Sequence, residues 1–140
     1  MAMRRRNRDQ RGAAAVEFAL VLPIFLMVLF GIVDFGYMIN RNSIINNAAR
    51  DAVRVATFPG VTEAEVRQAA ANTLDDVPGA VVVLGCRPAK QTDPTCTFAD
   101  RKSGNYAQVT IRYEHEMITP VGAFFPGGFT LNRTSEMRVE

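Results

Sequence analysis

Few side chains in this sequence have the types and spacing that catalysis requires. His115 is the only histidine, and it falls on the apolar side of a predicted strand, where a packed histidine is commoner than a general base. The carboxylate pairs Asp75–Asp76 and Glu114–Glu116 are most simply interpreted as solvated surface charges. The sequence has no glycine-rich phosphate-binding loop. We therefore expect a protein that is not an enzyme, with no catalytic residues and no bound cofactor.

The two cysteines, Cys86 and Cys96, are the other residues with chemical potential. Outside the cytoplasm such a pair is expected to form a disulfide, with two free thiols as the alternative. Closing so short a loop would stabilise the fold by roughly 2–3 kcal/mol in the chain-entropy model. Two cysteines and the distant His115 do not make a zinc site, so no metal is expected.

The charges are distributed unevenly along the 140 residues. Residues 1–12 contain five arginines and one aspartate, a net charge of +4, whereas eleven basic residues balance eleven acidic ones from Asn40 onward. A nucleic-acid-binding domain would need a basic face, so no nucleic acid is expected as a partner. Basic residues beside a membrane helix remain on the cytoplasmic side. The N-terminus is therefore predicted to be cytoplasmic and the C-terminal part extracytoplasmic.

An apolar segment runs from Ala13 to about Ile39 and is interrupted by Glu17 and Asp34. A helix needs about 20 residues to cross the hydrocarbon core of a bilayer, and the segment supplies that length. Pro23 lies within it and is expected to bend the helix. A cleaved secretory signal peptide is disfavoured, because the run exceeds the roughly 7–15 apolar residues of such signals and no small-x-small cleavage site follows.

The helix is predicted to continue beyond the membrane. Apolar residues recur at helical spacing as far as Ala56, and Phe58-Pro59-Gly60 ends the pattern. The sequence therefore divides into three parts. These are a basic leader at 1–12 that is expected to be cleaved, a long helix at 13–57 with its transmembrane part at about 13–36, and an extracytoplasmic domain at 58–140.

The extracytoplasmic domain is predicted to contain one helix and about three strands. A capping box at Thr62 and Glu65 begins the helix, which is expected to end near Asp75–Asp76. Strands are predicted at residues 80–84, 106–118 and 129–140. The first is expected to be buried on both faces because it is a continuous apolar run. The fold class is thus α+β, with a long N-terminal transmembrane and amphipathic helix followed by a small antiparallel sheet.

Glu17 is the most informative residue, because a carboxylate in a membrane span is costly and is by default a functional hypothesis. Around it the sequence reads Gly12-Ala13-Ala14-Ala15-Val16-Glu17-Phe18. This resembles the prepilin peptidase site of type IV-like pilins, in the G-x-x-x-x-E-[FY] form of the Flp/Tad system. The resemblance implies cleavage between Gly12 and Ala13. It also implies that Glu17, with Phe18 beside it, sets the register of subunits by pairing with the Ala13 amine of a neighbour.

The resemblance extends through Phe30–Gly36 and Asn46–Arg54, and the first 56 residues are similar to the TadE-like family of minor pilins, or pseudopilins. It implies a structural, non-enzymatic subunit of a Tad pilus that functions in assembly, adhesion or secretion. The implied partners are the membrane, the prepilin peptidase, the major Flp-type pilin, other minor pilins and the assembly platform. The implied location is the inner membrane, and the extracellular pilus after assembly.

Two alternatives remain. The chain could be a single-pass membrane-tethered binding module that keeps its leader and never enters a filament. It could also be an adhesin at the pilus tip, which would use the Cys86–Cys96 loop and Phe124–Phe125 as contact sites. We expect the phenylalanine pair instead to pack onto the sheet or the long helix.

Overall fold

A computed structural model describes the backbone of residues 3–140 and the side chains of residues 12–140. The arginine side chains of the predicted leader lie outside this described part. The chain forms two compact units. The helical unit comprises the residues up to Gly36 together with Met117–Pro126. The sheet unit comprises Tyr37–Glu116 and Gly127–Glu140.

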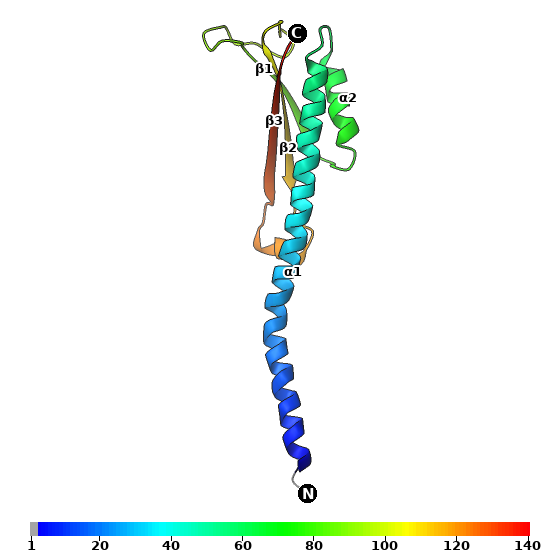
Figure 1. The fold of residues 1–140 in the computed structure, drawn as a ribbon, viewed down its shortest axis with the longest axis vertical. Coiled ribbons are helices and arrows are strands. Elements are labelled where there is room, and N and C mark those ends of the chain that lie inside the picture. Colours follow the sequence, from blue (N-terminus) through cyan, green and yellow to red (C-terminus); the bar gives the residue numbers. More distant parts are fainter. Residues whose placement is uncertain (1–2) are drawn as a thin grey trace. The chain divides into compact units, whose positions relative to one another are not determined.

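Helix α1 is a single α-helix from Met3 to Ala56 that contributes to both units (Figure 1). It begins before the expected start at Ala13, because arginine, asparagine and glutamine are compatible with a helix and no proline or glycine precedes Gly12. It continues through Pro23 and ends close to the predicted boundary.

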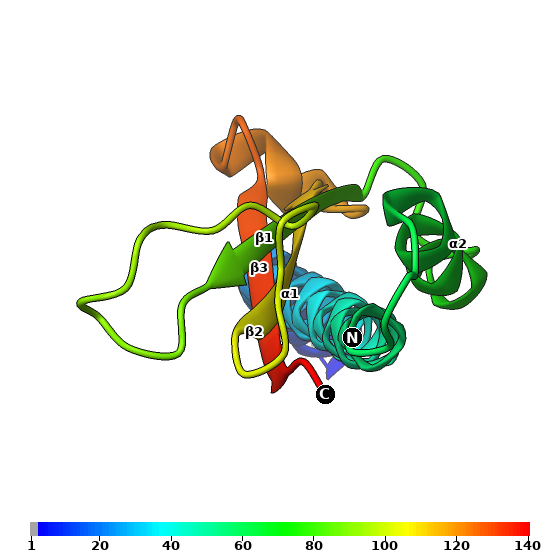
Figure 2. The same ribbon diagram turned by 90° about the horizontal axis from the view of Figure 1, so that it is seen from above.

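The sheet unit contains the rest of the regular structure. Helix α2 (Glu63–Thr73) and strands β1 (Val81–Arg87), β2 (Tyr106–His115) and β3 (Phe129–Arg138) follow residues 37–56 of α1. The three strands form an antiparallel sheet in the order β1-β2-β3. Within this unit α1 packs against one face of the sheet and α2 lies beside α1 (Figures 1 and 2). The predicted α+β fold is confirmed.

Small residues of α1 form the centre of the core. Ala48, Ala49 and Ala52 are fully buried and follow the helical repeat of one face. They lie in one cluster with Val109 and Ile111 of β2, which are also fully buried. Because alanine has a short side chain, the helix and the central strand can approach closely.

Strand β1 differs from its prediction. Val81 and Val83 are 57% and 42% exposed, whereas Val82 and Leu84 pack against the core. The strand therefore alternates, and the expectation of burial on both faces was wrong. Its physical reason is that helices cover one face of the sheet only, so that every second valine of the run faces outward.

Two links hold the long connection between β1 and β2. A disulfide joins Cys86 to Cys96, with the Cα atoms 5.4 Å apart. The Arg101 guanidinium donates hydrogen bonds to the carbonyl oxygens of Ala56, Phe98 and Val61, at 3.0, 2.8 and 2.6 Å. Burial lowers the pKa of Arg101, while the charge of Glu63 acts in the opposite direction. This arginine satisfies a carbonyl at the end of α1 that has no partner within the helix.

Candidate membrane-anchoring and processing site

The N-terminal part of α1 has an uncovered apolar surface. Its most apolar window has a mean hydropathy of 2.6 and none of it is buried in the protein. Phe18, Leu20 and Ile24 are 65–69% exposed. It is the one helix in the described part of the chain that is long and apolar enough to cross a membrane. An apolar surface this extensive needs a lipid or protein environment that removes it from water.

The predicted processing residues all lie on this exposed stretch. Gly12, Ala13, Glu17 and Phe18 are exposed and fall on successive turns of α1. Ala13 and Glu17 are separated by one helical turn, so they lie on the same face. The ion pairs found among the described side chains do not involve Glu17.

Gly12 has no role in packing. A Cβ atom added there would meet nothing within 4 Å, and its backbone does not need the conformational freedom of glycine. The fold therefore does not explain a glycine at this position. A small side chain at this position would leave the described structure undisturbed.

Asp34 makes tertiary contacts that the sequence pattern did not predict. It is 3% exposed. Its Oδ1 accepts hydrogen bonds from the backbone amides of Ile118 (3.0 Å) and Thr119 (3.2 Å), and its Oδ2 accepts one from the Thr119 hydroxyl (2.5 Å). A buried carboxylate is stable only with such donors. A charge at the end of an apolar run is the one signal that could have indicated its role.

The partners of Asp34 belong to the segment Met117–Pro126, which contains a short 3₁₀ helix at Pro120–Phe124. Thr119 caps this helix, and its side chain accepts a hydrogen bond from the amide of Val121 at 3.3 Å. Phe124 is 71% exposed and Phe125 is 50% exposed. The expectation that this pair packs onto the sheet or the long helix was therefore wrong for most of the Phe124 surface.

His115 is a packed residue of the sheet unit. It is 1% exposed, and its ring lies 5.6 Å from that of Tyr37 and 6.2 Å from that of Tyr113, centroid to centroid. The guanidinium of Arg41 lies over the ring of Tyr37, 4.6 Å from its centroid. A histidine enclosed in this way has no access to a substrate, in keeping with its predicted position on the apolar side of the strand.

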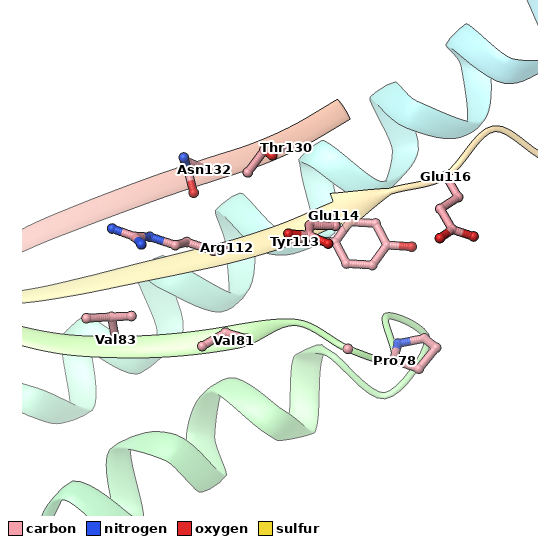
Figure 3. Close-up of a pocket in the computed structure, with 10 residues that line it drawn as sticks. Pro78, Val81, Val83, Arg112, Tyr113, Glu114, Glu116, Thr130 and Asn132 are labelled. Carbon is pink, nitrogen blue, oxygen red and sulfur yellow. The ribbon is translucent and has the colours of Figure 1, made fainter. Parts of the chain in front are cut away.

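A shallow groove crosses the open face of the sheet (Figure 3). Val81 and Val83 of β1, Arg112 and Glu114 of β2, and Thr130 and Asn132 of β3 line it. It contains no cysteine, serine or histidine. Among the described residues no group of three or more histidine, cysteine or acidic side chains is placed to hold a metal ion. The groove therefore presents a mixed polar and apolar surface.

An exposed apolar helix joined to a small α+β unit fits a single-pass membrane anchor. Residues 12–54 match the model of the family described as TadE-like protein. The match begins at Gly12, contains Glu17 and Asp34, and confirms the predicted resemblance of this helix to the TadE-like family. The match covers most of α1 but neither α2 nor the sheet. No curated protein and no solved structure matches the chain significantly.

Proposed function

We propose that this chain is a minor pilin, or pseudopilin, of a Tad/Flp-type pilus, and that a prepilin peptidase processes it before assembly. The observation that carries the proposal is the position of the Gly12-to-Glu17 motif. It lies at the N-terminal end of the exposed apolar part of α1, where the TadE-like match also begins. No catalytic role is proposed for the chain itself.

Processing would change the electrostatics of the anchor. The leader carries a net charge of +4, which holds the N-terminus on the cytoplasmic side of the inner membrane. Cleavage between Gly12 and Ala13 removes this charge and leaves an amine at Ala13. The apolar stretch from Ala13 to Val33 is then about 30 Å long at 1.5 Å per residue, the thickness of the hydrocarbon core. Residues 58–140 would lie on the extracytoplasmic side.

Glu17 would favour transfer of the subunit from the bilayer into the filament. A carboxylate near the edge of a membrane span is costly. Pairing it with the Ala13 amine of a neighbouring subunit offsets that cost, because two opposite charges in a low dielectric stabilise each other. Glu17 with Phe18 would thereby set the register against the major Flp-type pilin and other minor pilins at the assembly platform.

The proposal is tested by recovery of the chain in sheared pilus filaments. Glu17→Gln keeps the size of the side chain and removes its charge. We expect this variant to remain in the membrane and to be several-fold depleted from the filament fraction. Glu114→Gln, on the open face of the sheet, is the matched control and should be recovered as the wild type is. Equal recovery of Glu17→Gln and wild type would exclude registration by Glu17.

Absence of the wild-type chain from filaments, with its leader still attached, would instead identify a membrane-tethered binding module. The same fractions therefore separate the two classes of function.

A further inference from the structure

The segment Met117–Pro126 has an exposed apolar surface that the anchor and the sheet do not explain. It carries no charged residue. Ile118, Phe124 and Phe125 are 61%, 71% and 50% exposed. Aromatic and large aliphatic side chains grouped in this way on a surface mark a contact with lipid or with another protein.

Asp34 attaches this segment to α1 at a defined position along the helix axis. It accepts the two amide hydrogen bonds of Ile118 and Thr119, and all three residues belong to the helical unit. Asp34 directly follows the stretch from Ala13 to Val33, which has about the length of the hydrocarbon core. The segment is therefore attached where a helix beginning at Ala13 would reach the far surface of the hydrocarbon core.

The other sides of α1 at the level of Asp34 are also apolar. Ile32, Val33 and Phe35 are 65%, 46% and 57% exposed. The helix therefore presents exposed apolar side chains at the same level as the segment, within one unit. An element with phenylalanine and aliphatic side chains at the boundary of the hydrocarbon has the composition of an interfacial membrane segment.

We propose that Met117–Pro126 is a membrane-docking segment that inserts Phe124 and Phe125 into the extracytoplasmic leaflet. Asp34 holds it there, and its carboxylate satisfies the backbone amides that would otherwise face lipid without partners. The inference rests on the proposed membrane anchoring of α1. It adds a second lipid contact, formed by a stretch far along the chain from the helix.

The chain contains no tryptophan, so single-tryptophan variants of the full-length protein report on depth without background. We would reconstitute three variants separately in vesicles of phosphatidylethanolamine and phosphatidylglycerol at a low ratio of protein to lipid. Phe124→Trp tests the segment. Phe25→Trp tests the span, and Phe58→Trp is the control from the sheet unit, where that phenylalanine is 53% exposed. Brominated lipids and aqueous iodide are the two quenchers.

We expect brominated lipid to quench Phe25→Trp and Phe124→Trp several-fold more than Phe58→Trp, and iodide to show the reverse order. Quenching of Phe25→Trp by lipid, with Phe124→Trp quenched by iodide alone, would overturn the docking inference and leave the anchor intact. That outcome would place the segment in water. Absence of lipid quenching at Phe25→Trp would overturn the anchor itself, and the inference with it.

A second variant tests the role of Asp34. Adding Asp34→Ala to Phe124→Trp should reduce lipid quenching several-fold, whereas the same change beside Phe25→Trp should have no effect. Asp34→Asn should restore much of the signal, because its amide oxygen can still accept from the two backbone amides. Unchanged quenching of Phe124→Trp in the alanine variant would contradict the positioning role.

Discussion

The carboxylate of Asp34 in α1 accepts hydrogen bonds from both the backbone amide and the hydroxyl of Thr119, 85 positions along the chain. This contact holds the segment Met117–Pro126 against the helix. It places a buried carboxylate at the end of the apolar stretch, and a buried carboxylate depends on hydrogen-bond donors that the protein itself supplies.

Replacing Asp34 by alanine should release the amides of Ile118 and Thr119. A hydrogen bond to a charged acceptor contributes about 1.5–3 kcal/mol, so we expect their hydrogen exchange to accelerate by roughly tenfold or more. Asp51→Ala, which removes an exposed carboxylate of α1 bonded to Thr73, is the control. Unchanged exchange at both amides in Asp34→Ala would contradict the contact.

Gly128 should be far less replaceable than its neighbour Gly127. Both have positive φ, at 62° and 103°, but a Cβ at Gly128 would lie 2.3 Å from the carbonyl oxygen of His115, whereas nothing lies within 4 Å at Gly127. The conformational strain of alanine is about 1–2 kcal/mol at either position. Overpacking should cost Gly128→Ala about 1–3 kcal/mol more. Denaturant unfolding of both variants measures the difference, and equal stabilities would refute the steric argument.

The capping box of α2 should make the stability of this helix depend on pH. Hydrogen bonds from the amide and hydroxyl of Thr62, both at 2.8 Å, lower the pKa of Glu65 below its ordinary value of 4.5. A lowered folded pKa means that the stabilisation is complete above 4.5 and is lost as the pH falls through the folded value. We expect Glu65→Gln to remove this pH dependence of stability while keeping the hydrogen bonds of the capping box.

Thermal unfolding from neutral pH to below 4.5 compares wild type with Glu65→Gln. Their difference in stability should shrink towards the acid end. A constant difference across this range would show that the Glu65 carboxylate does not act through its charge.

Reduction of the disulfide between Cys86 and Cys96 should destabilise the sheet unit. Its loop is short, with a sequence separation of 10, and the chain-entropy model gives a loss of roughly 2–3 kcal/mol. The Cys86→Ser, Cys96→Ser double variant should match the reduced wild type in denaturant unfolding and should not respond to a reducing agent. Two titratable thiols in the native protein would contradict the pairing.

The sequence predicted those features that are encoded locally. The spacing of Ile45, Ala48 and Ala52 indicates the buried face of α1, and Thr62 with Glu65 marks the start of α2, because periodicity and caps act within a few residues. The Gly12-to-Glu17 motif is local in the same sense.

The contacts that local patterns cannot encode were missed. Asp34 and Thr119 are joined only by the tertiary fold, so neither residue indicates the other. The exposure of Val81 and Val83 has the same cause, because an apolar run does not say whether one or both faces of its sheet will be covered. The side chain of Arg101 donates to three carbonyl groups, and nothing in the sequence around it predicted these contacts.

The N-terminal residue of the protein extracted from membranes tests the central claim most directly. In cells that make the prepilin peptidase we expect the chain to begin at Ala13. In cells without it, or in a variant with Gly12 replaced by a bulkier residue, we expect it to retain residues 1–12. Because Gly12 makes no packing contact, such a variant should fold and insert normally. A wild-type chain that still carries residues 1–12 in the presence of the peptidase would contradict the account of this protein as a processed pilin.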